Sequence, residues 1–253
     1  MPWNPDRYHQ FRSERAAPFE DLLGLIERRD GLSVVDLGCG PGELTQRLAD
    51  ELPASEVVGI DSSEEMLEHA VRDTRPGLRF ELGDIATVSG QWDLVFSHAA
   101  IQWLDHHETL VPRLMTLVQP GGQLAVQVPS NQRHPALVYI RDVAGEEPFS
   151  TALGGYNRDF PVLSVDRYAD LLYESGGTQL TVFEKVYPHV LQDADALADW
   201  SLGTALVPYL ERLPADLHDP FLNRYRAKLQ ARWPGSPVFY GFRRILFAAT
   251  VPG

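Results

Sequence analysis

The chain has 253 residues, of which 44% are hydrophobic, 23% charged and 10% aromatic. These fractions are ordinary for a globular domain and exclude disordered, collagen-like and disulfide-scaffold proteins. The formal net charge of −13 opposes general binding to nucleic acid or to anionic membranes, because both require a cationic surface. With one cysteine and no apolar stretch at the N-terminus, we expect a cytoplasmic protein that has no nucleic-acid or membrane partner.

The first half of the chain is predicted to alternate between strands and helices. Short apolar, β-branched runs predict strands at 33–37, 56–60, 78–82, 93–97 and 123–128. Apolar spacing predicts helices at 43–51 and 106–118, and Ser62 with Glu65 resembles the capping box of a further helix. This alternation predicts a doubly wound α/β sheet, mostly parallel, with right-handed crossovers.

The second half is less regular. Residues 129–163 are rich in proline and glycine and are predicted to form loops and short helices. A helix at 164–175 and strands at 178–187 and 244–250 follow, and helical patterns broken by prolines fill 192–232 between those two strands.

We therefore expect a single domain over residues 1–253, with a seven-stranded Rossmann-like sheet and a helical cap inserted before the last strand. Its parts are N-terminal lid helices at 1–30, a cofactor-binding half at 31–128 and a substrate half at 129–253 with the cap at about 189–238.

The strongest chemical signal is a glycine-rich turn, GCGPG at residues 38–42, between a predicted strand and a predicted helix. Glycine lets the backbone turn sharply and approach a ligand, and the helix N-terminus offers free N–H groups to an anion. Asp61 ends the next strand, 19 residues after Gly42. A carboxylate there can accept both hydroxyls of a ribose, so the pair predicts a nucleoside-containing cofactor.

The details of this turn distinguish between cofactors. A dinucleotide motif would require glycine at position 43, where the chain has Glu43, whose charge would repel a pyrophosphate. The G-x-G-x-G spacing, the preceding Asp36 and the sequence Gly83-Asp84-Ile85 resemble the class I S-adenosylmethionine-dependent methyltransferases. In that family the loop passes the methionine part, the second-strand acid holds the ribose and the third-strand acid meets the adenine amino group. The resemblance thus assigns these roles to residues 38–42, Asp61 and Asp84.

Further blocks resemble the trans-aconitate 2-methyltransferase family over nearly the whole chain. They are WNPxxYxxFxxER from Trp3, DLGCGPG from Asp36, GIDSS from Gly59, QWL from Gln102, LAVQVP from Leu124, RY from Arg224 and FxR from Phe242. The resemblance implies a monomeric cytoplasmic enzyme that transfers a methyl group from S-adenosylmethionine to a carboxylate of trans-aconitate. The chain departs from the family in the loops at 130–160 and at Arg243, where the family predicts proline.

The resemblance also implies two sets of binding residues. The cofactor set is Phe11, Arg15, Asp36, Gly38, Cys39, Gly40, Asp61, Ser62, Met66, Asp84, Ile85, Ser97, His98 and Trp103. The set for the polycarboxylic acid is Tyr8, Trp103, Arg224, Tyr225, Tyr240 and Arg244. Tyr8, Phe11 and Arg15 share one helix face, which either packs on the sheet edge or closes over the cofactor. No catalytic residue is expected, because a carboxylate with a pKa near ~4 is ionised at neutral pH and needs no general base.

The charge distribution along the chain allows two interpretations. Residues 220–253 contain six cations and no acidic residue, although the whole chain carries −13. This segment is either a solvated basic surface or a site for an anion. Arginine suits the second role, because its planar guanidinium binds a carboxylate through two hydrogen bonds.

No metal is expected. In the sequence Asp105-His106-His107-Glu108, adjacent helical residues diverge by about 100° and cannot share one ion. Cys39 has no Cys-x-x-Cys partner, which opposes a redox role. Three alternatives stay open: an NAD-dependent oxidoreductase, a non-catalytic module that binds S-adenosylmethionine, and a methyltransferase for another small metabolite.

Overall fold

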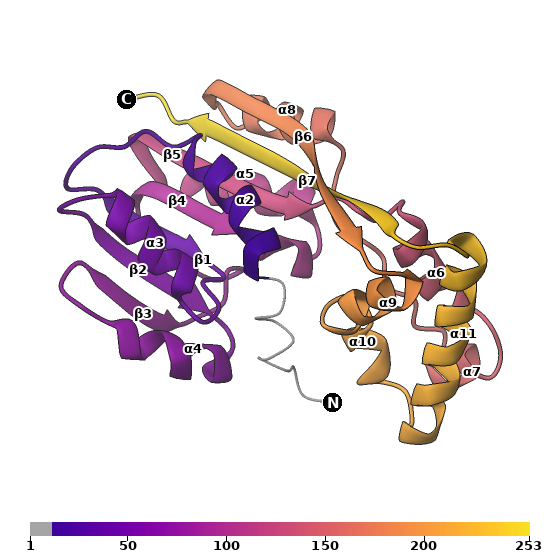
Figure 1. The fold of residues 1–253 in the computed structure, drawn as a ribbon. Helices are drawn as coiled ribbons and strands as arrows, with labels where there is room; N and C mark the ends of the chain where they lie inside the picture. Colours follow the sequence, from indigo (N-terminus) through magenta and orange to yellow (C-terminus); the bar gives the residue numbers. More distant parts are fainter. Residues whose placement is uncertain (1–11) are drawn as a thin grey trace. The chain divides into compact units, whose positions relative to one another are not determined.

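A computed structural model describes the backbone of residues 12–253 and the side chains of residues 17–253 (Figure 1). The described chain divides into two compact units. The sheet unit comprises Ala16–Pro129, Pro161–Lys185 and Arg244–Gly253. The described parts of the helical unit are the backbone of residues 12–15, Ser130–Phe160 and Val186–Arg243. The single-domain interpretation stays a prediction.

The predicted seven-stranded, mostly parallel sheet is confirmed. Its order is β3-β2-β1-β4-β5-β7-β6. The strands are β1 (Ser33–Leu37), β2 (Glu56–Asp61), β3 (Leu78–Leu82), β4 (Trp92–His98), β5 (Val118–Pro129), β6 (Thr178–Leu191) and β7 (Val238–Thr250). Strands β1 to β5 pair in parallel and β7 runs antiparallel to β5. The carboxyl ends of β1, β2, β4 and β5 therefore lie at one edge.

Helices cover both faces of this sheet (Figure 1). On one face, α2 (Arg12–Leu23) and α3 (Glu43–Glu51) contribute Phe19 and Leu48 to a core with Phe96 of β4. On the other, α5 (His107–Thr116) and α8 (Val165–Glu174) pack against Val95. Successive residues of β4 thus serve opposite cores, because side chains alternate across a strand.

The helical unit has its own core. Its helices are α6 (Pro135–Ala144), α7 (Phe149–Ala152), α9 (Ala194–Leu202), α10 (Val207–Leu210) and α11 (His218–Arg232). Phe221, Tyr225 and Leu229 of α11 are fully buried together with Ile140 and Leu197. Helices α9 to α11 lie between β6 and β7 along the chain, as the sequence predicts for the inserted cap.

One local prediction is wrong, and another is confirmed. The N-cap of α4 (Glu64–Ala70) is Ser63, whose hydroxyl accepts from the N–H of Met66 at 3.2 Å, so Ser62 does not form the predicted capping box. The predicted loops and short helices follow Pro129, and they include a ten-residue helix, α6, whose first residue is Pro135. Proline is tolerated there because the first helical N–H needs no intrahelical partner.

The two adjacent histidines that could suggest a metal belong to the start of α5. His107 is buried, and its Nε2 lies 2.9 Å from the carbonyl oxygen of Ile101, which can only accept. Nε2 therefore carries the hydrogen, and Nδ1 accepts from the hydroxyl of Tyr168 at 2.6 Å. Burial lowers the pKa of His107 and keeps the ring neutral. Both ring nitrogens thus join α5 to the core.

The described residues contain no group of three or more His, Cys, Asp or Glu side chains arranged to hold a metal ion. Among the same residues, no helix is long and apolar enough to cross a bilayer.

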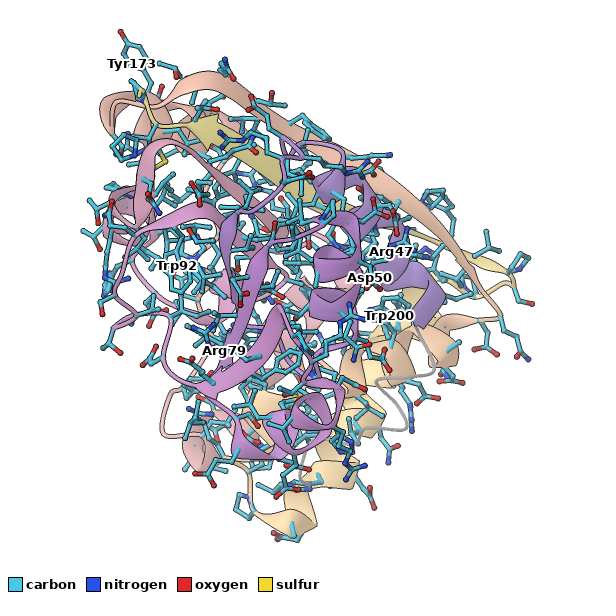
Figure 2. All side chains as sticks on the ribbon, turned by 90° about the vertical axis from the view of Figure 1, so that its left-hand side faces the viewer. Arg47, Asp50, Arg79, Trp92, Tyr173 and Trp200 are labelled. Atoms are coloured by element: carbon cyan, nitrogen blue, oxygen red, sulfur yellow. The ribbon has the colours of Figure 1, made fainter. Side chains whose placement is uncertain are left out.

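Tyr168→Phe is expected to lower the free energy of unfolding by roughly 1–3 kcal/mol, because Nδ1 of His107 loses its donor while remaining buried. Urea denaturation at pH 7 measures this loss. Tyr173→Phe on the same helix is the matched control and should leave stability unchanged, since Tyr173 is 73% exposed and projects from the molecular surface (Figure 2). Equal stability of Tyr168→Phe and the parent would contradict the assigned role of this hydroxyl.

Candidate active site

The glycine-rich turn has the backbone that its sequence predicts. Gly38, Gly40 and Gly42 have φ angles of +80°, +55° and +86°, a region that other residues rarely adopt. A Cβ atom on Gly38 would lie 2.1 Å from the Cβ of Ala100, whereas one on Gly40 would meet no atom of the described residues within 4 Å. The loop is therefore packed against the chain at Gly38, and no described residue fills the space beside Gly40.

Asp61 joins the loops that follow β1 and β2. Its Oδ2 accepts from the N–H of Gly40 at 2.8 Å, and its Oδ1 accepts from the N–H of Ser63 at 2.9 Å. The parallel register pairs Leu37 with Ile60, so the carboxylate stands directly beyond the two strand ends. Each carboxylate oxygen has a second lone pair, so Asp61 can hold both loops and still accept hydroxyl groups of a ligand.

Asp36, at the end of β1, is a buried acid. It is 4% exposed, and its Oδ2 accepts from the hydroxyl of Thr45 at 2.6 Å. Burial, with a further contribution from the charge of Asp61, raises the pKa of Asp36 to about 7. Burial and the two nearby carboxylates also raise the pKa of Cys39, so its thiol is protonated at neutral pH and cannot serve as a thiolate nucleophile. Thr45 was not foreseen in the sequence, because its role depends on how α3 packs on β1.

The loops after β3 and β4 complete the rim of this edge. Asp84 is exposed and its Oδ1 accepts from the N–H of Ala86 at 2.8 Å, whereas Ile85 is half-buried. Ser97 is fully buried and donates to the carbonyl of Leu37 at 2.8 Å, so its hydroxyl connects β4 with β1. Trp103, which ends the short helix η2 (Ile101–Trp103), is 53% exposed and offers an aromatic surface.

Polar side chains also line the sheet face that α2 covers. His98, the last residue of β4, contacts Phe19 with ring centroids 5.5 Å apart. It pairs in register with Gln127 of β5, which is fully buried, while Arg244 of β7 stands opposite Pro129 and is 4% exposed. Sequence analysis identified His98 and Arg244 but missed Gln127. A polar residue within the apolar run Leu124–Val128 was the available signal.

The other predicted acceptor residues belong to the helical unit. Arg224 pairs with Glu146 at 3.1 Å. Tyr225 is fully buried with its hydroxyl 2.9 Å from that of Ser201. The hydroxyl of Tyr240 accepts from Asn131 at 3.0 Å. Their grouping with Arg244, which lies in the sheet unit, stays a prediction.

The remaining predicted residues are placed only in part. Ser62 is exposed and Met66 is half-buried at the start of α4. Tyr8 and Phe11 lie outside the described residues, as does the side chain of Arg15.

The sheet order and the glycine loop define a class I methyltransferase fold. A family model described as a methyltransferase domain matches residues 34–122. The chain is 49% identical to a trans-aconitate 2-methyltransferase of Deinococcus radiodurans, over 100% of this chain and 99% of that protein. Another from Variovorax paradoxus is 40% identical over 92% of this chain and 91% of that protein.

Among solved structures, the phosphoethanolamine N-methyltransferase 2 of Haemonchus contortus, in complex with phosphomonomethylethanolamine and S-adenosylhomocysteine, matches with a TM-score of 0.56 at 17% identity. The match covers 95% of this chain and 53% of that one, and it shows a common fold. On the similarity to the curated relatives, the chain belongs to the trans-aconitate 2-methyltransferase family.

The buried acid at the end of β1 predicts a pH-dependent stability. The folded-state pKa of Asp36 lies above its ordinary value, so the folded protein binds this proton more tightly than the unfolded chain. The stabilisation by protonated Asp36 is therefore complete at low pH and is lost as the pH rises to about 7. Asp36→Asn removes this titration. The variant should therefore gain stability relative to the parent by about 1 kcal/mol per pH unit between pH 5 and 7. Urea unfolding of both proteins at pH 5, 6, 7 and 8 measures the difference, and parallel pH profiles would contradict the assignment.

Proposed function

We propose that this chain transfers the methyl group of S-adenosylmethionine to a carboxylate of trans-aconitate and forms a monomethyl ester. The observation that carries the proposal is the open glycine loop bound to Asp61, in a chain 49% identical over its full length to a trans-aconitate 2-methyltransferase. The alternative acceptor is another small metabolite.

The residues at the carboxyl edge fit this cofactor. The open side of Gly40 leaves room beside the backbone, and Asp61 retains lone pairs for the ribose hydroxyls. Asp84 is exposed at the end of β3, where it can accept from the adenine amino group, and Trp103 can cover an aromatic base. Helix α3 begins with Glu43, which opposes the pyrophosphate of a dinucleotide and disfavours an NAD-dependent oxidoreductase.

The chemistry needs positioning more than proton transfer. When bound, S-adenosylmethionine supplies a methyl group already activated by its sulfonium. An oxygen of the acceptor carboxylate forms the new C–O bond as the C–S bond breaks, and the electron pair of that bond stays on sulfur. No proton moves, so the protein must hold the carboxylate in line with the methyl group and exclude water.

Arginine is the side chain best suited to hold the remaining carboxylates of the acid. The net charge of −13 repels a polyanion at long range, so cations must gather where the acid binds. Arg244 is buried at the same edge as the glycine loop, whereas Arg224 already pairs with Glu146. We therefore assign the principal clamp to Arg244, with Arg224, Tyr225 and Tyr240 as further candidates from the helical unit.

The family resemblance supports the first two of three further proposals, and the net charge of −13 supports the third. Tyr8, Phe11 and Arg15 would close over the cofactor, the protein would act as a monomer in the cytoplasm, and it would have no nucleic-acid or membrane partner.

The proposed reaction is tested with ¹³C-methyl S-adenosylmethionine and a panel of di- and tricarboxylic acids that includes trans-aconitate. We expect a labelled, base-labile methyl ester of trans-aconitate. Labelling of another acid of the panel in place of trans-aconitate would favour the alternative acceptor, and tighter binding of NADH than of S-adenosylmethionine would contradict the methyltransferase function.

Asp61→Asn tests the ribose contact. The variant should bind S-adenosylmethionine more weakly by roughly 1.5–3 kcal/mol, the size of a hydrogen bond to a charged group. Isothermal titration calorimetry measures the affinity, and circular dichroism checks that the variant is folded. Asp73→Asn, which removes the same charge from an exposed position, should bind like the parent. An unchanged affinity in folded Asp61→Asn would refute the contact.

Arg244→Lys keeps the positive charge and removes the planar guanidinium group, and Arg244→Ala removes both. If the site is desolvated, the lost contact should cost about 2–5 kcal/mol of transition-state binding, seen as lower kcat/KM for trans-aconitate, with cofactor affinity unchanged. Arg243→Lys is the neighbouring control, since Arg243 is exposed. Parent-like turnover in both Arg244 variants would contradict the assignment of Arg244 as the carboxylate clamp.

A further inference from the structure

Gln127 of β5 is a buried polar side chain without a function in the fold. It is 0% exposed, and within the part of the chain that the structure describes neither Oε1 nor Nε2 has a hydrogen-bond partner. A buried amide left unpaired is unfavourable, and such groups in native proteins are usually satisfied by a ligand, water or another side chain.

Gln123 provides the contrast on the same strand. It lies four residues earlier and therefore points to the same face. Its Nε2 donates to the carbonyl of Leu25 at 2.9 Å, and its Oε1 accepts from the N–H of Glu27 at 3.0 Å. Gln123 thus connects the segment after α2 to β5 by two hydrogen bonds, whereas the amide of Gln127 forms none with the described residues.

The sheet order places Gln127 between the two parts of the proposed site. From the glycine loop on β1, the next strands are β4 with His98, β5 with Gln127 and β7 with Arg244. In register, Gln127 pairs with Leu246 and Arg244 pairs with Pro129, so Arg244 is a diagonal neighbour of Gln127 on the adjacent strand. Such neighbours lie about 7–8 Å apart, a distance at which two long side chains can reach different carboxylates of one small acid.

We propose that the side-chain amide of Gln127 binds the acceptor acid, with Nε2–H donating to an oxygen of the carboxylate that is methylated. Arg244, one strand further from the glycine loop, holds a carboxylate that does not react. This assignment rests on the proposed function and adds to it a residue that determines which carboxylate faces the methyl group.

A neutral amide suits the reacting carboxylate for a chemical reason. A guanidinium forms stronger, charge-assisted hydrogen bonds and would stabilise the negative oxygen before it attacks. Such stabilisation of the ground state lowers the rate, whereas a weaker amide contact orients the carboxylate and preserves its nucleophilicity. In the proposed site, charged Arg244 binds the carboxylate that does not react, and the neutral amide of Gln127 orients the carboxylate that is methylated.

Gln127→Met and the matched control Gln123→Met test the proposal, because methionine keeps the unbranched shape and removes the amide. For Gln127→Met we expect a Tm equal to or above that of the parent, since an unpaired buried amide is removed. Its affinity for S-adenosylmethionine should be unchanged, and its kcat/KM for the acid should fall about 10- to 100-fold. Gln123→Met should show the reverse, with a lower Tm and the kcat/KM of the parent.

Parent-like kcat/KM in Gln127→Met would overturn the proposal. So would a fall in its Tm as large as that of Gln123→Met, because the amide would then be structural. The parent is assayed first on the acid panel. Methylation of a different acid would contradict trans-aconitate as acceptor but not Gln127, which the same variants then test with that acid. Absence of transfer to every acid would contradict both proposals.

Discussion

The carboxylate of Asp61 is the interaction on which the rest of the site depends. By accepting from the N–H groups of Gly40 and Ser63, it connects the loop after β1 with the loop after β2. The contact is possible because parallel pairing aligns the ends of the two strands, with Leu37 opposite Ile60. The glycine loop is therefore shaped by contacts within the fold, and no described residue fills the space beside Gly40.

The edge combines three electrostatic environments across neighbouring strands. On β1 the buried Asp36 titrates near neutral pH, on β2 the half-buried Asp61 serves as a hydrogen-bond acceptor, and on β7 the buried Arg244 supplies positive charge. Asp36 and Asp61 thus lie on the strands proposed to hold the cationic sulfonium cofactor. Arg244 lies on the strand proposed to hold the anionic acceptor. This order is fixed by strand pairing, which separates the two charges within one site.

Local signals were enough to predict much of the fold. The β1 turn with its glycines and the acid ending β2 are contained within about thirty residues, and both were predicted correctly. The cap of α4 was placed one residue early, since Ser62 and Ser63 are chemically equivalent in sequence and only the backbone selects between them. Short helices were predicted after Pro129 but the bounds of α6 were not, because proline both breaks helices and begins them. Gln127 was missed because its significance depends on pairing between β4, β5 and β7, which sequence order alone does not reveal.

The most direct test of this site is a crystal structure of the protein with S-adenosylhomocysteine and trans-aconitate. We expect the ribose hydroxyls within hydrogen-bond distance of Asp61, and one acid carboxylate against the amide of Gln127 with another against Arg244. An acid bound away from β5 and β7, or a nucleoside away from Asp61, would contradict the assignment of this sheet edge as the place of methyl transfer.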